Sequence, residues 1–224
     1  MILSELFNKY DTDKGNLRET YHNYGLLYEE IFSHIAVENL LEIGIDEGNS
    51  LRAWAEYFPN ATIYGADKNF RGISNPKIKQ LKCDQNNIQS FFTQSFEVLP
   101  LLDIIIDDGG HCMNHHAITL AGLWRKLKSG GFYIIEDVNT CNFPHIAKMY
   151  SQPILNDTAN TLKMFKGYLM DDNKINHVFE TPFAELQDFK VSEIDYVRII
   201  GDDNMDTLDI ERIKNHGLII IKKI

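Results

Sequence analysis

The chain has few cysteines, no long apolar run and no basic stripe, and each absence excludes a class of protein. Its 224 residues include only three cysteines, at positions 83, 112 and 141, which are too few and too scattered for a disulfide framework. No run approaches the roughly 18 consecutive apolar residues that a membrane helix needs. The formal net charge of −10 argues against a nucleic-acid partner, because phosphate binding requires a basic surface.

We expect no signal peptide at the start of the chain. The segment Met1-Ile-Leu-Ser-Glu5 has neither the basic start nor the apolar core of a signal peptide, so we expect a cytoplasmic location. With 44% hydrophobic and 24% charged residues, the chain can bury a sizeable core and fits one α/β domain. The acidic balance suits a metal ion or a cationic cofactor.

Short runs rich in β-branched and aromatic residues alternate with segments of helical spacing. Strands are predicted at 40–44, 62–67, 78–83, 103–107 and 131–136. Helices are predicted between them at 50–58, 87–96 and 115–127, and Lys128-Ser-Gly-Gly131 is expected to end the last helix. This alternation is typical of βαβ units and predicts a Rossmann-like α/β fold with a mostly parallel sheet.

The two ends of the chain depart from this alternation. We interpret residues 1–35 as an N-terminal helical lid and residues 36–224 as the main domain, within a single domain overall. Later elements are predicted as helices at 143–150 and 158–170 and as strands at 196–200 and 217–222. The last two strands are expected to pair antiparallel at the sheet edge. We expect the lid and residues 142–172 to close one side of the site.

Two of the predicted strands each end in a pair of acids. Asp107-Asp108 precedes Gly-Gly-His111, and Glu136-Asp137 follows the next strand. Because the carboxyl ends of parallel strands lie at one edge of a sheet, up to four carboxylates and one imidazole would share a small space. Desolvation and mutual repulsion penalise such acids unless a cation, a proton or a hydrogen-bond donor compensates. A divalent metal with oxygen ligands is the simplest compensator.

The loop after the first predicted strand suits a cationic ligand. Gly44 and Gly48 would let the backbone turn tightly and approach a ligand closely. The nearby acids Glu42, Asp46 and Glu47 would repel the phosphates of a dinucleotide. This acid-rich loop therefore disfavours a nicotinamide dehydrogenase.

The next two strands end in acids suited to a nucleoside. Asp67 lies 23 residues after Gly44, where a carboxylate can bond both ribose hydroxyls. Asp84 ends the third strand and is placed to accept a hydrogen bond from an adenine amino group. Either acid could instead cap a turn, which is a common role of Asp.

In their order and spacing these motifs resemble the class I S-adenosylmethionine-dependent methyltransferases. More narrowly, the chain resembles the metal-dependent macrolide-type sugar O-methyltransferases and related small bacterial methyltransferases of polysaccharide pathways. The resemblance covers roughly residues 5–140. The residues that carry it are Thr12-Asp-Lys-Gly15, His22, Tyr24, Tyr28-Glu29, Leu41-Glu-Ile-Gly44, Tyr64-Gly-Ala-Asp67, Asp107-Asp-Gly-Gly-His111 and Ile135-Glu-Asp137.

The resemblance implies S-adenosylmethionine and Mg²⁺ as cofactors. It implies that Asp108, Glu136 and Asp137 hold the metal, that His111 is the general base, and that the Asp-Lys-Gly element closes over the cofactor. Which of the adjacent acids at 107 and 108 faces the metal is left open. The predicted catalytic residues are His111 and Asp108. The predicted cofactor-binding residues are Lys14, Tyr24, Glu42, Gly44, Asp46, Gly48, Asp67, Asp84 and Asp107.

The expected activity is methyl transfer to a hydroxyl of a sugar or a sugar-containing small molecule. A phosphoryl, phosphoramidate or catechol-like oxygen is an alternative acceptor, and a non-catalytic methyltransferase-like binding module is an alternative of another class. We expect no membrane or nucleic-acid partner, and a homo-oligomer. His111, Cys112, His115 and His116 offer soft ligands, but the neighbouring acids prefer a hard ion to zinc. We expect His115 and His116 to lie on the exposed start of a helix.

Overall fold

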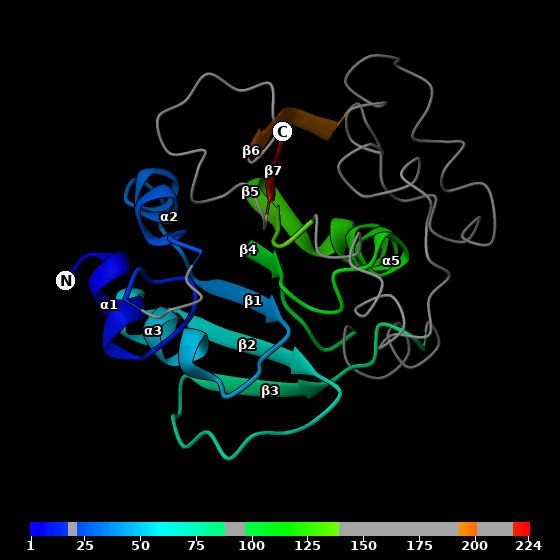
Figure 1. Ribbon diagram of the computed structural model, residues 1–224. Coiled ribbons are helices and arrows are strands. Elements are labelled where there is room, and N and C mark those ends of the chain that lie inside the picture. Colours follow the sequence, from blue (N-terminus) through cyan, green and yellow to red (C-terminus); the bar gives the residue numbers. More distant parts are fainter. Residues whose placement is uncertain (18–21, 88–96, 139–192, 201–216) are drawn as a thin grey trace.

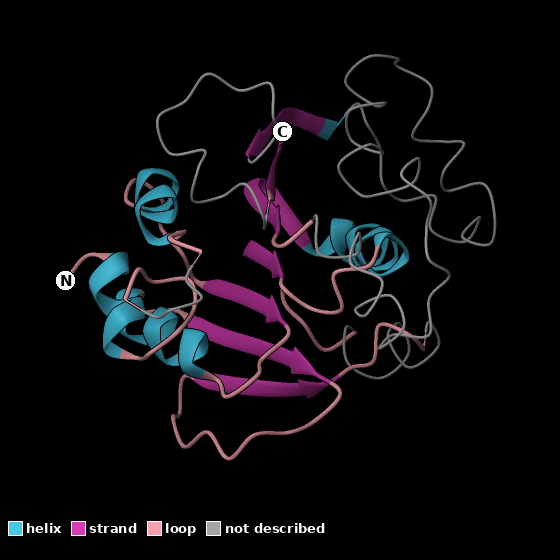
Figure 2. Ribbon diagram, viewed as in Figure 1, coloured by secondary structure: helices cyan, strands magenta, loops and turns pink. Residues whose placement is uncertain are grey.

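One mixed sheet organises the chain. The computed structural model describes residues 1–17, 22–87, 97–138, 193–200 and 217–224. Within these ranges the sheet has seven strands in the order β3-β2-β1-β4-β5-β7-β6 (Figures 1 and 2). The strands are β1 (Asn39–Ile43), β2 (Thr62–Asp67), β3 (Ile78–Lys82), β4 (Leu102–Asp107), β5 (Leu127–Ile135), β6 (Ile194–Ile200) and β7 (Leu218–Lys223). The first five run parallel, and β7 is antiparallel to both β5 and β6.

Helices cover both faces of the sheet because the strand side chains alternate between two hydrophobic cores. In β1, Leu40 packs into one core and Leu41 into the other. The first core lies under α1 (Leu3–Lys9), α2 (Gly25–Phe32) and α3 (Asn49–Tyr57). The second lies under α5 (Met113–Leu123) and the 3₁₀ turn Trp124–Lys126, on the other side of the sheet (Figure 1).

The N-terminal segment contributes aromatic side chains to the first core. Phe7 of α1 and Tyr28 of α2 meet Trp54 of α3 in edge-to-face contacts, with ring centroids 4.9 and 5.4 Å apart. Phe32 stacks on Tyr28 at 5.3 Å. All four rings are buried. Residues of the predicted lid therefore pack onto the sheet, and its closing role stays a prediction.

The predicted fold class is confirmed, and the five parallel strands lie close to their predicted positions. The antiparallel C-terminal pair at the sheet edge is also confirmed, with β6 as the outermost strand and β7 between β5 and β6. Lys128-Ser-Gly-Gly131 was expected to end a helix, and this prediction is wrong because these residues lie inside β5. The pairing register of β4 and β5 shifts here, and Gly130, with φ +76°, accommodates the irregularity.

Several predictions fall on parts of the chain that the structure does not describe. They are the predicted helices at 87–96, 143–150 and 158–170 and the segment 142–172. In the part that is described, no helix combines the length and apolar character needed to cross a bilayer.

Candidate active site and metal centre

Acidic side chains gather where the three central strands β1, β4 and β5 end. Glu42 lies in β1, Asp107 and Asp108 stand at the end of β4, and Glu136 and Asp137 directly follow β5. Because β4 pairs with both β1 and β5, these strand ends lie side by side. Gly44 makes the close approach possible, since its φ is +86° and a Cβ there would overlap the carbonyl oxygen of Asp108.

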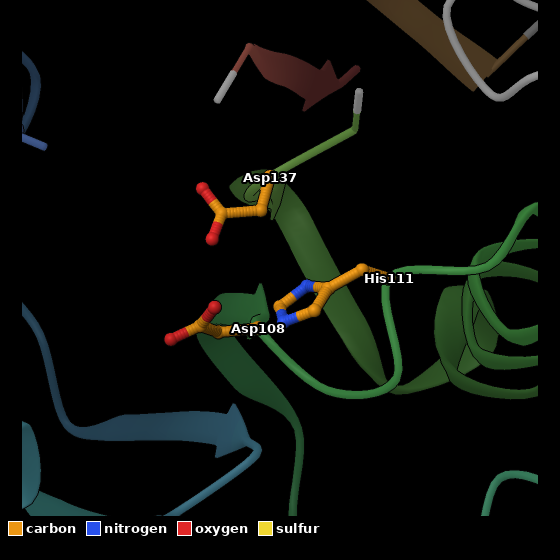
Figure 3. A group of neighbouring side chains, drawn as sticks. All are labelled: Asp108, His111 and Asp137. Carbon is orange, nitrogen blue, oxygen red and sulfur yellow. The ribbon is translucent and has the colours of Figure 1, made fainter. Parts of the chain in front are cut away.

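Asp108, His111 and Asp137 form a group that could hold a metal ion. One ligand atom from each lies within 4.8 Å of the others. Figure 3 shows the three side chains converging from the loops that follow β4 and β5. His111 and Asp137 have φ values of +53° and +54°, a left-handed conformation that is uncommon for residues with a side chain. Such backbone conformations concentrate at functional sites, where they aim a side chain.

Lys14 brings a positive charge into this group from the N-terminal segment. Its ammonium nitrogen lies 2.5 Å from Asp108 Oδ2, 2.7 Å from Glu136 Oε2 and 3.6 Å from Glu42 Oε1. The side chain is only 1% exposed. Burial alone would lower the pKa of Lys14, but these carboxylates outweigh it and raise the pKa well above its usual value. Lys14 is therefore a permanently charged partner of the acids.

Tyrosines from the same segment bond the acids that follow β5. The Tyr24 hydroxyl donates to Asp137 Oδ1 at 2.9 Å, and the Tyr28 hydroxyl donates to Glu136 Oε1. His22 Nδ1 lies 3.5 Å from Asp137 Oδ1. Adjacent acids therefore have different surroundings. Glu136 is held by Lys14 and Tyr28, whereas Asp137 faces Asp108 and His111.

The electrostatics of the cluster suit a divalent cation with oxygen ligands. Burial, with repulsion from Asp108 added, raises the pKa of Asp137 to about 8. Burial raises the pKa of Glu42 to about 7 and that of Glu136 well above its usual range, although Lys14 opposes both shifts. One ammonium in contact with three carboxylates leaves negative charge uncompensated. The donor set of Asp108 and Asp137 fits Mg²⁺, which prefers carboxylate oxygens.

His111 is suited to take up a proton. Burial lowers the pKa of its imidazole, and the charge of Asp108 only partly reverses this shift. A lowered pKa keeps the ring uncharged near neutral pH, and an uncharged imidazole can accept a proton. The side chain is close to the acids of the metal group, so it can act on a group held there.

Two clefts open beside the metal group and share Gly44 as a wall. The first, of about 470 Å³, runs across the ends of β1, β2 and β3 and includes Asp67 and Asp84. The second, of about 360 Å³, lies between the N-terminal segment and the loop after β1, and includes Lys14, Asp46 and Asp108. A ligand that extends from one cleft to the other would pass over Gly44. The position at strand carboxyl ends is where open α/β sheets bind ligands.

The two acids predicted to bind a nucleoside line the first cleft and also cap turns. Asp67 accepts hydrogen bonds from the backbone N–H of Ile45 at 3.0 Å and of Asn69 at 2.8 Å. Asp84 accepts from the N–H of Asn86 at 2.9 Å. The capping role and the cleft position are therefore compatible, and each carboxylate is fixed at the rim by the backbone.

Four other predicted cofactor-binding residues are absent from the walls of both clefts. Tyr24 and Glu42 are fully buried, and Glu42 accepts a hydrogen bond from Trp54 Nε1 at 2.8 Å. Gly48 has φ +75° and precedes α3, where a Cβ would overlap Ile73. Asp107 is also fully buried and bonded within the protein. These four residues line neither cleft, so they can shape the site only through their neighbours.

Sequence reasoning missed two buried residues beside the first cleft. Gln85 bonds the Asp107 carboxylate, and His115 Nε2 lies 2.8 Å from Asn86 Oδ1. The expectation that His115 and His116 are exposed is wrong: they are 1% and 0% exposed. The helix start is covered by the loops after β3 and β4, which a sequence pattern does not reveal. No motif marked Gln85, and its position directly after Asp84 was the only available signal.

The chain is similar in sequence to proteins named as O-methyltransferases. No family model matches the chain. It is 33% identical over 152 residues to a tetracenomycin rhamnosyl 3'-O-methyltransferase of Streptomyces olivaceus, covering 63% of this chain and 38% of that protein. It is 32% identical over 152 residues to mycinamicin VI 2''-O-methyltransferase of Micromonospora griseorubida, covering 63% and 37%. The matches thus span well under half the length of these relatives.

The fold is shared with a solved methyltransferase. MycE from the mycinamycin pathway, in complex with Mg and SAH, matches all of this chain and 55% of its own, with a TM-score of 0.69 and 22% identity. A second MycE structure also contains mycinamycin VI and matches with the same TM-score of 0.69. The chain therefore has a Rossmann-like methyltransferase fold and is similar in sequence to sugar O-methyltransferases.

Proposed function

We propose that this chain is a Mg²⁺-dependent, S-adenosylmethionine-dependent O-methyltransferase that acts on a hydroxyl of a sugar or a sugar-containing small molecule. The observation that carries the proposal is the group of Asp108, His111 and Asp137 at the edge of two strand-end clefts. The relatives support it, because they are named as O-methyltransferases of glycosylated natural products. MycE supports both cofactors, since its structures contain Mg and SAH.

Each of the two clefts would bind one part of the cofactor. Asp67 and Asp84 would take the ribose hydroxyls and the adenine amino group in the first cleft. The second cleft, with Asp46 and Asp108 in its wall, would surround the charged sulfur end. Its acids favour a sulfonium cation over the neutral thioether product, which helps the product to leave. The chemistry that S-adenosylmethionine supplies there is an electrophilic methyl group.

Around the acceptor, the residues of the chain align and deprotonate a hydroxyl. Asp108 and Asp137 would hold Mg²⁺, and Glu136 would complete or support the set from its place beside Lys14. The chemistry that Mg²⁺ supplies when bound is a positive charge that makes a nearby hydroxyl proton easier to remove. His111 takes that proton as the oxygen–methyl bond forms. The sulfur–methyl bond breaks at the same time, and its electron pair stays on sulfur.

The first experiment is calorimetric titration of the chain with S-adenosylmethionine, with Mg²⁺ and with EDTA. Transfer of a labelled methyl group is then measured with a panel of free and glycosidic sugars and one catechol. Cofactor binding followed by Mg²⁺-dependent labelling of a sugar is the expected result. Labelling of the catechol alone would keep the reaction class and refute the acceptor. Well-folded protein that binds no S-adenosylmethionine would refute the proposal.

A cytoplasmic location and a homo-oligomeric state remain predictions of the sequence.

A further inference from the structure

Gln85, in the loop that follows β3, bonds across the carboxyl ends of the strands. Its side-chain Nε2 donates to Asp107 Oδ1 at 2.9 Å and to Thr119 Oγ1 of α5 at 2.8 Å. Its Oε1 accepts a hydrogen bond from the backbone N–H of Gly110 at 2.7 Å. The residue is 8% exposed. Both ends of one buried amide therefore join the loop after β3 to β4, to α5 and to the loop that follows β4.

The loop held in this way carries two members of the metal group. Gly110 lies between Asp108 and His111, so its N–H fixes the backbone that aims both side chains. The loop also packs closely, because a Cβ at Gly109 would overlap the Gln85 amide and a Cβ at Gly110 would overlap the His115 ring. Two consecutive glycines make a backbone pliable. Here a buried hydrogen bond and tight packing restrict that freedom without abolishing it.

The same residues form one wall of the first cleft. Gln85, Gly109 and Gly110 line it together with Asn86 and His115. A nucleoside in this cleft would therefore press on the pliable loop at the point where Gln85 holds it. Ordering the loop costs conformational entropy, and a ligand that has already ordered it lowers the cost for the next ligand. The cleft and the metal group are thus joined through one short stretch of backbone.

We propose that Gln85 is a positioning residue that couples occupation of the nucleoside cleft to metal binding by Asp108 and its partners. This inference rests on the proposed function, because it takes the first cleft as the nucleoside site. Coupling between two binding sites is reciprocal, so each ligand must tighten the other by the same factor. Without the Gln85 amide, the Gly110 N–H and the Asp107 carboxylate each lose a buried hydrogen-bond partner. The loop after β4 is then no longer bonded to the wall of the first cleft.

The chain offers a matched control in Gln80. This glutamine lies in β3, and its side-chain amide also bridges two groups, the backbone N–H and C=O of Arg71, both at 2.7 Å. It lines neither cleft. Gln80→Met therefore removes a side-chain amide bridge from β3, five residues before Gln85, without touching the loop after β4. An effect specific to Gln85→Met cannot then be a general consequence of losing such a bridge.

The test measures Mn²⁺ binding, as a probe of the Mg²⁺ site, with and without saturating S-adenosylhomocysteine. Wild-type protein should bind Mn²⁺ at least about fivefold more tightly when S-adenosylhomocysteine is present, the lower end of typical coupling between sites. Gln80→Met should keep this factor. Gln85→Met should reduce it to below about twofold, while thermal melting confirms that the variant is folded.

Each other result overturns a defined claim. Independent binding of Mn²⁺ and S-adenosylhomocysteine to the wild type, or full coupling in Gln85→Met, would overturn the inference and leave methyl transfer untouched. Failure of folded wild-type protein to bind S-adenosylhomocysteine would overturn the proposed function and the inference with it. If Gln85→Met does not fold, Gln85→Asn answers the same question, because its shorter amide cannot reach Asp107 and Gly110 together. Intact coupling in Gln85→Asn would refute the role of Gln85.

Discussion

Replacing Lys14 by methionine tests whether the acid cluster depends on the N-terminal segment for its charge balance. Methionine is unbranched and nearly as long as lysine, so the substitution keeps most of the apolar side chain and removes an ammonium that contacts Asp108, Glu136 and Glu42. Removing one partner of a buried ion pair typically costs about 3–5 kcal/mol, because the other charge stays buried and unpaired. In a protein of this size each kcal/mol lowers the melting temperature by about 2–4 °C. We therefore expect Lys14→Met to melt roughly 6–20 °C lower in EDTA, the product of those two ranges.

Lys128 provides the matched control, because it bridges two carboxylates at distances similar to the two shorter contacts of Lys14. Its ammonium nitrogen lies 2.7 Å from Glu38 Oε2 and 2.8 Å from Asp103 Oδ1. The side chain is 27% exposed, however, and ion pairs in contact with water contribute at most about 1 kcal/mol. Lys128→Met should therefore melt within about 4 °C of the wild type. The contrast between the two variants measures burial, since the geometry of the ion pairs is nearly the same.

Adding Mg²⁺ separates the charge of Lys14 from its packing. If the variant loses stability because acids are left uncompensated, a divalent cation at Asp108 and Asp137 should restore part of it. Mg²⁺ should then raise the melting temperature of Lys14→Met more than that of the wild type. The reasoning would be refuted if the melting temperature of Lys14→Met were as close to that of the wild type as the melting temperature of Lys128→Met is. An equal response of both proteins to Mg²⁺ would refute the part that concerns the metal.

Three further predictions follow from the site. His111→Ala should lower methyl transfer by at least about 100-fold, because general-base catalysis contributes that much. Its affinity for S-adenosylmethionine in calorimetry should stay unchanged, and the exposed His34→Ala should behave as wild type in both assays. Gly44→Ala should lose more than about 1 kcal/mol in urea unfolding, because its φ is positive. Gly72→Ala, whose Cβ would meet nothing within 4 Å, should lose none. Burial raises the pKa of Glu42 from 4.5 to about 7 in the folded protein. The folded state therefore binds a proton that the unfolded state has lost between these pH values, so unfolding in EDTA should become easier as the pH rises from 4.5 to about 7. In Glu42→Gln this pH dependence should be weaker.

The fold could be predicted because each of its main elements is encoded locally. Runs such as Thr62–Asp67 carry β-branched residues and are bounded by turns, and the observed strand has the same limits. The start of β5 was predicted at Gly131 instead of Leu127, because Gly130 and Gly131 usually end elements. In this chain they lie within a strand whose pairing register shifts, and a register shift depends on the partner strand. A single-sequence pattern contains no information about that partner.

The candidate site could be predicted only as far as its residues lie in local motifs. Asp108, His111 and Asp137 follow predicted strands, and the parallel sheet brings their ligand atoms within 4.8 Å of one another. Contacts between residues far apart in the sequence could not be predicted from local motifs. The hydrogen bond from Lys14 to Glu136 joins residues 122 positions apart, and the bond from Gly110 to Gln85 joins residues 25 apart. Neither contact has a sequence signature, because each depends on how loops pack after the sheet has formed.

The alternation of side chains along a strand explains which acid of each pair meets the N-terminal segment. Consecutive residues point to opposite faces of a sheet. In β4, Ile104 and Ile106 pack into the core under α1–α3, and Ile105 packs into the core under α5. Continuing this pattern sends Asp108 toward the N-terminal segment and Asp107 toward α5, where Asp107 is bonded by Gln85 and Tyr133.

The same alternation sends Glu42 and Glu136 toward the N-terminal segment, and Lys14 contacts both of them as well as Asp108. Asp137 should by this rule point away from Asp108. Its left-handed backbone, with φ +54°, interrupts the alternation and brings its carboxylate back to Asp108 and His111. The metal group therefore depends on one local departure from strand geometry. That departure stands directly after β5, where Asp tolerates the conformation better than a β-branched residue would.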